Sequence, residues 1–170
     1  MLPVIVSADL TAAFKLGTVD ALKDDVQKGL DRLPDFQTVS GGFGYWTNPW
    51  LPDPYITAYA LEVSALAGKE GYRLPKESLA KAVAWLKSYL SSNPQLAYPY
   101  NENEAYAARS YAVYVLALNG EPLPGYFQQL YAKRDQIPLL AKTFLLKAAP
   151  LVLSDQGPRQ TLAAELLNQG

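Results

Sequence analysis

Apolar residues recur three and four positions apart along most of the chain, and prolines and glycines interrupt this pattern at intervals. Such spacing gathers apolar side chains on one face of an α-helix, whereas a half-buried strand alternates at every second position. Residues 4–6 would also suit a strand, and no other segment alternates convincingly. The pattern therefore predicts an all-α fold.

Local signals at the ends of the apolar runs give the expected helix boundaries. Asp20 favours a helix start because a carboxylate complements the positive end of the helix dipole, and Pro34 closes that helix. Pro75 occupies the place of a first helical residue, and Asn119-Gly120 ends a later helix. The predicted helices cover residues 3–14, 20–33, 55–68, 75–92, 102–118, 123–133, 137–152 and 159–167.

An internal repeat organises these helices into pairs. The segment 57–70 resembles the segment 110–121, with the equivalent residues 52 positions apart, and the helices before them align at an offset of 57. The offset of 52 pairs like residues: Tyr59 with Tyr111, Ala60 with Ala112, Val63 with Val115, and Gly68 with Gly120. Repeated helical hairpins bury their faces against their neighbours and build solenoids or closed α/α toroids. We therefore expect one domain over residues 1–170 that forms an incomplete α/α toroid.

Composition narrows the functional classes. The chain has 170 residues, of which 49% are hydrophobic and 18% charged, as in a single globular domain. A net charge of −1 gives no basic surface for nucleic acid, and no apolar run is long enough for membrane insertion. The absence of cysteine and histidine excludes thiolate metal sites, cysteine nucleophiles and the serine–histidine relay. We expect no enzyme, metal or cofactor, although catalysis by carboxylates, lysine or tyrosine stays open.

The stretch SGGFGYW at residues 40–46 is the most unusual local motif. No strand precedes it and no Lys-Ser/Thr pair follows it, so it is neither a P-loop nor a dinucleotide fingerprint. Its glycines are expected to allow a positive φ or a close backbone approach between two helices. We expect its rings to fill the space at one end of the helical layer, with a ligand platform as the alternative. These rings are Phe43, Tyr45, Trp46 and Trp50.

Twelve tyrosines are many for a chain of this length. They are expected to be core residues whose hydroxyls reach water or a backbone carbonyl, or else an aromatic patch that docks another domain. The tyrosines near hairpin ends or on core stripes are Tyr55, Tyr59, Tyr98, Tyr100, Tyr106, Tyr111 and Tyr114.

Two acidic pairs could serve a glycosidase mechanism. Asp24 and Asp25 are expected on a solvated helix face, and Glu102 and Glu104 at a helix N-terminus, where carboxylates complement the dipole. The sequence gives no distance between them, so it favours these structural roles over catalysis.

The order of motifs resembles the thioester domain of bacterial α2-macroglobulins. In that family a helix leads to Gly-Gly-Phe-Gly-Tyr-Trp, then to a Trp-Leu-Thr-Ala-Tyr-Val-Leu-like helix, to Gly-Tyr-x-Val-Pro and to Ala-x-x-Trp-Leu. The matching pieces here are residues 33–37, 41–46, 56–61, 71–75 and 82–86. The resemblance covers about half of the chain well and implies an α/α toroid, in agreement with the repeat.

The same resemblance implies a function. Members of the family inhibit proteases broadly: a bait region is cut, the molecule changes conformation, and a Cys–Gln thioester acylates the trapped protease. The family motif Tyr-Gly-Cys-x-Glu-Gln is missing from this chain, which is expected to begin just after it and to be non-catalytic by itself. Some relatives use a histidine to direct the acyl transfer toward hydroxyls, so the lack of histidine implies transfer to lysine amines.

A thioester survives in water only where apolar groups exclude nucleophiles. The residues expected to shield it, or to contact a neighbouring domain, are Tyr45, Trp46, Trp50, Tyr98 and Tyr100. The expected partners are proteases, through the parent protein, and neighbouring domains of that parent, in the periplasm or outside the cell. The alternatives are an α/α-toroid enzyme such as a terpene cyclase or glycosidase, and a helical-repeat scaffold that binds a protein through its tyrosine-rich edge.

Overall fold

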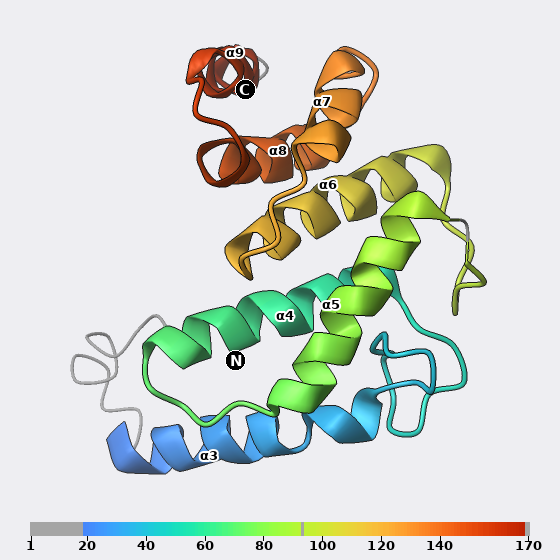
Figure 1. Ribbon diagram of the computed structural model, residues 1–170, viewed down its shortest axis with the longest axis vertical. Coiled ribbons are helices and arrows are strands. Elements are labelled where there is room, and N and C mark those ends of the chain that lie inside the picture. Colours follow the sequence, from blue (N-terminus) through green and yellow to red (C-terminus); the bar gives the residue numbers. More distant parts are fainter. Residues whose placement is uncertain (1–18, 93, 169–170) are drawn as a thin grey trace.

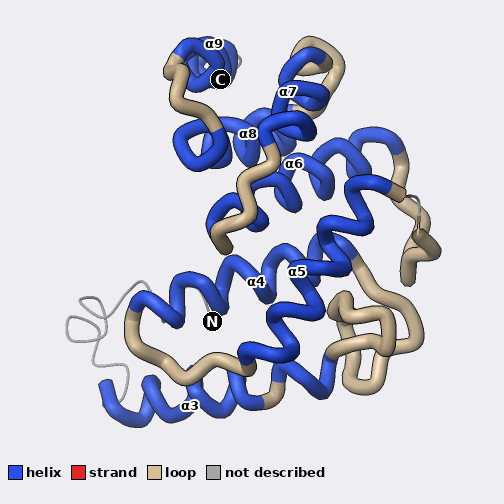
Figure 2. Tube along the Cα trace, viewed as in Figure 1, coloured by secondary structure: helices blue, strands red, loops and turns tan. Residues whose placement is uncertain are grey.

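The computed structural model describes residues 19–92 and 94–168, and Figures 1 and 2 show that its regular structure there is helical. The elements are α3 (Val19–Asp31), a 3₁₀-helix η1 (Leu33–Phe36), α4 (Pro54–Lys69), α5 (Lys76–Ser91), α6 (Glu102–Leu118), α7 (Pro124–Ala132), α8 (Leu139–Val152) and α9 (Gly157–Leu167). The one β-type pairing among them is an isolated bridge between Gln37 and Phe43. The predicted all-α class is confirmed, while the helix predicted over residues 3–14 lies outside the described residues.

The helix boundaries follow the sequence signals closely. Helix α6 has the predicted bounds because Asn101 and Glu104 form a reciprocal capping box at its start and Gly120, at φ +83°, ends it. Pro34 lies inside η1 rather than directly after α3, since the chain tightens into a 3₁₀ turn there. Gly68 lies within α4, and the positive φ that ends the turn belongs to Gly71.

Helices α4, α6 and α8 form the inner layer of the fold. Helix α6 packs along both α4 and α8, and α5 contacts α4 and α6. Helix α7 contacts α6 and α8, and α9 covers α8 (Figure 1). Alternation of inner and outer helices is compatible with an arc of an α/α toroid, and closure of the ring stays a prediction.

Small residues let the inner helices approach closely. Ala108 and Ala112 of α6, together with Ala141 and Ala148 of α8, have no exposed surface. Larger side chains fill the remaining space, including the stacked rings of Tyr111 and Phe144, whose centroids are 4.2 Å apart. The main core is therefore continuous from α4 to α9.

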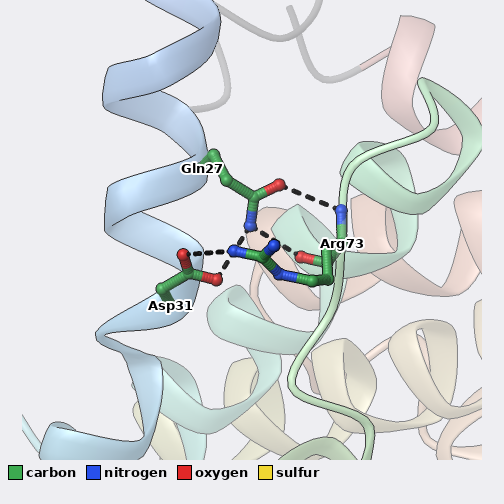
Figure 3. Close-up of polar contacts among 3 residues, drawn as sticks. All are labelled: Gln27, Asp31 and Arg73. Atoms are coloured by element: carbon green, nitrogen blue, oxygen red, sulfur yellow. Dashed lines mark hydrogen bonds and ion pairs between the residues drawn. The ribbon is translucent and has the colours of Figure 1, made fainter.

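Helix α3 joins the rest through a smaller apolar cluster and a polar clasp. Val26 and Leu30 pack against Val63 and Ala67 of α4. Gln27 accepts a hydrogen bond from the Arg73 backbone N–H and donates one to the Arg73 carbonyl, each at 3.0 Å, while the Arg73 guanidinium pairs with Asp31 (Figure 3). The ion pair is exposed and contributes little, so the amide clasp fixes the register of α3 on the 70–75 loop.

Candidate interaction surface

The aromatic loop, defined as residues 37–53, is held to the end of η1 by its own backbone. The Gly44 N–H donates to the Phe36 carbonyl at 3.0 Å, and the Asn48 N–H donates to the Asp35 carbonyl at 2.8 Å. The Asp53 N–H closes the loop by donating to the Phe43 carbonyl at 2.8 Å. Because its backbone groups are paired in this way, the loop has a fixed conformation.

Two glycines of the motif are required by geometry. Gly41 has φ +101°, and a Cβ there would lie 2.8 Å from the Lys81 carbonyl oxygen. A Cβ on Gly42 would lie 2.6 Å from the indole ring of Trp85. The loop therefore lies directly on α5, and the predicted role of the glycines in positive φ and close backbone approach is confirmed.

Two polar side chains that the sequence analysis did not single out anchor the loop to the neighbouring helices. Gln37 donates to the Ser78 carbonyl and accepts from the Ser78 hydroxyl, both at 2.7 Å. Thr57 accepts from the Phe43 N–H at 2.8 Å and donates to the Asp53 carbonyl at the same distance. Ser78 lies 41 residues after Gln37, and Phe43 lies 14 residues before Thr57, so no local pattern could have indicated these two contacts.

Asp53 organises the start of α4 and is fully buried. Its carboxylate accepts from the N–H groups of Tyr55 and Ile56, and from the hydroxyl of Tyr100 at 2.9 Å. Burial, followed by the negative charge of Asp53, raises the pKa of Tyr100 far above its ordinary value. An Asp directly before a Pro is a recognisable helix start, so the cap was detectable, but its link to Tyr100 was not.

The predicted residues Tyr45, Tyr98 and Tyr100 are brought together. The rings of Tyr45 and Tyr98 meet edge to face with centroids 5.7 Å apart. They line a cavity of about 300 Å³ together with Tyr100, Asp53 and Tyr55. Burial raises the pKa of Tyr45, and the nearby charge of Asp53 raises it further, so this hydroxyl stays neutral at physiological pH.

Trp46 and Trp50 do not pack into the helical layer, so that expectation was wrong for these two rings. Their side chains are 74% and 94% exposed, although Phe43 is buried as expected. The reason is steric: Phe43 fills the space under the loop, and Gly42 already lies against Trp85. With the loop backbone engaged in its hydrogen bonds, both indoles are left exposed to solvent.

A second polar cluster, which the sequence analysis also did not predict, lies inside the helical layer. Glu62 of α4 accepts hydrogen bonds from Tyr111 and Tyr114 of α6 and from Lys147 of α8, the last at 2.8 Å. Burial alone would raise the pKa of Glu62, but the hydrogen bonds from Lys147 and Tyr111 outweigh it and the pKa is lowered. The tyrosines are core residues as expected, but their hydroxyls reach a carboxylate rather than water or a carbonyl.

The acidic pairs occupy the predicted structural positions. Asp24 and Asp25 are exposed on α3, and Glu104 caps α6 through Asn101. Within the part of the chain that the structure describes, no three acidic side chains gather in a way that could hold a metal ion. Among the helices of that part, none is both long and apolar enough to cross a bilayer.

Comparison with known proteins places the chain among large bacterial proteins. It is 29% identical to the α2-macroglobulin of Escherichia coli K12 over 129 residues and 30% identical to an α2-macroglobulin homologue of Yersinia pestis over 127 residues. These alignments cover 72% and 71% of this chain but only 8% and 6% of the relatives. The chain thus spans a small part of the curated relatives that it matches. No protein-family model matches it.

Solved structures show the same fold. The crystal structure of native E. coli α2-macroglobulin, from domain MG7 to the C-terminus, superimposes with a TM-score of 0.84 and covers 98% of this chain and 27% of that one. Trypsin-activated E. coli α2-macroglobulin gives 0.84, and the Salmonella protein reacted with methylamine gives 0.81, with 98% of this chain covered in both. These two alignments cover 12% and 11% of the solved chains. All three are 24% identical to this chain, so they show the fold.

Proposed function

Because this chain belongs to the bacterial α2-macroglobulin family, we propose that it is part of the thioester-bearing helical domain of a broad protease-trapping inhibitor. In the parent protein, cleavage of a bait region by a protease triggers thioester coupling to that protease. These residues supply scaffold and shielding and perform no catalysis. The parent acts in the periplasm or outside the cell.

The observation that carries this proposal is the exposure of Trp46 and Trp50 on a loop whose backbone is anchored. Exposing large apolar rings to water is unfavourable for an isolated domain. Exposed apolar surface of this kind marks sites that another part of a protein covers. The loop is fixed to both α4 and α5 through Thr57 and Gln37, so its rings are presented without further ordering.

Three tyrosines that line one cavity at the loop offer further aromatic surface, namely Tyr45, Tyr98 and Tyr100. Tyr45 and Tyr98 are about half exposed, and Tyr100 is tied to Asp53 beneath them. A reactive acyl group beside these rings would be screened from water, because the rings offer apolar surface while the buried carboxylate of Asp53 is occupied by its hydrogen bonds. We propose that five aromatic residues contact a neighbouring domain and shield the thioester: Tyr45, Trp46, Trp50, Tyr98 and Tyr100.

The experiment is made in the full-length parent. Replacing Trp46 and Trp50 by Ala is expected to raise spontaneous thioester hydrolysis severalfold, measured as release of free thiol over time. Leu167→Ala is the matched control, since this side chain is 82% exposed on α9, away from the loop. Thiol release at the wild-type rate in the double variant would show that the rings do not shield the thioester.

A second measurement separates shielding from domain contact alone. If the rings only bind a neighbouring domain, the double variant would gain sensitivity to limited proteolysis at the domain boundary without faster thiol release. Retained trypsin inhibition in a parent whose thioester cysteine is replaced would argue against coupling as part of the function.

A further inference from the structure

The cavity where the aromatic loop meets the start of α6 is walled by tyrosines. Its volume of about 300 Å³ is at the small end of the range for ligand pockets. The rings of Tyr45 and Tyr98 are 46% and 53% exposed and are inclined to each other by 75°, so they form two walls of a corner that is open to solvent. The other lining residues are Asp53, Tyr55, Pro99, Tyr100, Glu104, Ala107 and Leu140.

This cavity carries negative charge without a cation. Its lining includes Asp53 and Glu104 but no lysine or arginine among the residues that the structure describes. Asp53 is fully buried, and the ion pairs found within residues 19–92 and 94–168 do not include it. The positive end of the α4 dipole, which its carboxylate caps, offsets only about half a charge. The cavity therefore attracts a cation.

The tyrosine hydroxyls at this cavity are neutral and close to that charge. Burial is the first cause of the raised pKa of Tyr45 and of Tyr100, and the negative charge of Asp53 is the second. The Tyr100 hydroxyl donates to Asp53 at 2.9 Å, and a neutral hydroxyl that donates can still accept a hydrogen bond. A bound ammonium group can thus meet both ring faces and hydroxyl oxygens.

Elsewhere the chain places its own cations on tyrosine rings. Within the described part of the chain these pairs are Arg109 over Tyr89, Lys133 over Tyr106, Arg134 over Tyr131 and Lys147 over Tyr114. The Lys147 ammonium lies 4.1 Å from the Tyr114 ring centroid and donates to the Glu62 carboxylate at 2.8 Å. This cluster combines a tyrosine face, a carboxylate and a lysine. The Asp53 cavity has the first two and lacks the third.

Other cavities of the described residues differ in charge. Arg109 and Lys133 line a cavity of about 480 Å³ between α6 and α7. Arg32 lines an apolar groove of about 430 Å³ beside α4. Their own cations make these two cavities less suited to a positively charged ligand.

We propose that the Asp53 cavity binds the ammonium group of a lysine side chain on the surface that covers the aromatic loop. The identity of that surface rests on the proposed function, whereas the affinity of the cavity for lysine does not. A compact ammonium suits the corner between two inclined rings, while a flat guanidinium stacks on a single ring face. The apolar stem of the lysine lies against Leu140 and Ala107.

The test uses the full chain and a lysine probe, Nα-acetyl-lysine methylamide, with NMR spectra of the tyrosine rings. We expect saturable shifts of the Tyr45 and Tyr98 signals, with a dissociation constant in the millimolar range because the corner is open to water. The norleucine analogue has an alkyl side chain without the ammonium and is expected to bind at least tenfold more weakly. The arginine analogue is also expected to bind more weakly than the lysine probe.

Conservative variants assign the binding to this cavity. Tyr98→Leu keeps apolar bulk but removes the ring, so the lysine probe is expected to bind at least threefold more weakly. Tyr126→Leu changes a tyrosine of the cavity between α6 and α7 and is expected to leave the affinity unchanged. Asp53→Asn removes the charge but keeps an oxygen that can cap α4, and a loss of at least threefold is expected. If circular dichroism shows that Asp53→Asn does not fold, Glu104→Gln gives the charge test, with a loss of about twofold, because glutamine can also close a capping box.

Three results would overturn the proposal. One is the absence of saturable shifts, and another is equal affinity for the lysine and norleucine probes, which would mean that the cavity recognises apolar surface alone. The third is tighter binding of the arginine probe, or an unchanged affinity for lysine in Tyr98→Leu. None of these results bears on thiol release by the variant at Trp46 and Trp50, and thiol release at the wild-type rate would leave lysine binding intact. The two proposals therefore fail separately.

Discussion

The buried carboxylate of Glu62 gives the sharpest test of the packing of the inner helices. Glu62→Gln keeps the shape of the side chain and removes its charge. At present the carboxylate accepts from two tyrosines and from Lys147, so it joins α4, α6 and α8. A charge-assisted hydrogen bond contributes about 1.5–3 kcal/mol and a neutral one about 1 kcal/mol, while Lys147 regains water because it is 42% exposed. We expect the free energy of unfolding to fall by about 2 kcal/mol.

Urea unfolding followed by circular dichroism measures this loss at pH 7, and a loss of this size lowers Tm by about 4–8 °C in a domain of this length. The pH dependence follows from the lowered pKa of Glu62. A carboxyl whose folded pKa is lowered stabilises the fold above its unfolded pKa and loses this contribution as the pH falls through the folded pKa. The stabilities of wild type and Glu62→Gln are therefore expected to converge in acid.

Lys147→Met completes a double-mutant cycle. If the ion pair matters, the double variant loses less stability than the two single variants together, by about 0.5 kcal/mol or more. Two results would refute this reasoning. One is a free energy of unfolding for Glu62→Gln within about 0.5 kcal/mol of the wild-type value at pH 7. The other is a difference in free energy of unfolding between the two proteins that is the same in acid as at pH 7.

Two further predictions concern the loop and the chemistry of the parent. Gly41→Ala is expected to destabilise the fold by about 2–3 kcal/mol in urea, because the residue has φ +101° and its Cβ would meet the Lys81 carbonyl. Gly71→Ala has a similar φ but nothing within 4 Å of its Cβ, so about 1 kcal/mol is expected, and equal losses would show that the contact with α5 is unimportant. The intact parent is expected to couple to methylamine in preference to glycerol, measured by mass spectrometry. Equal coupling would contradict the inference from the missing histidine.

Most of the helical fold could be predicted because its signals are local. Helix α6 begins at the Asn101–Glu104 capping box and ends at Asn119-Gly120, and both features stand within a few residues of the boundary. The apolar period predicted the buried faces for the same reason. Glu62 and Lys147 are 85 residues apart, and no periodicity relates them.

The sequence could not predict which aromatic rings of the loop are buried, and the reason is different. Outside a helix there is no period to tell an inward ring from an outward one. Phe43 and Trp46 are three residues apart in the same motif, yet one is buried and the other exposed. The difference arises from the contact of Gly42 with Trp85, which brings the loop so close to α5 that one ring fills the available space.

The position of Trp46 and Trp50 gives the chain a built-in optical reporter. The sequence has three tryptophans, and these two face water while Trp85 is buried. Indole emission shifts to longer wavelengths in water, so the spectrum of the isolated chain is dominated by the state of the aromatic loop. Any surface that covers the loop would shift that emission to shorter wavelengths without an added label, and the buried ring of Trp85 provides an internal reference.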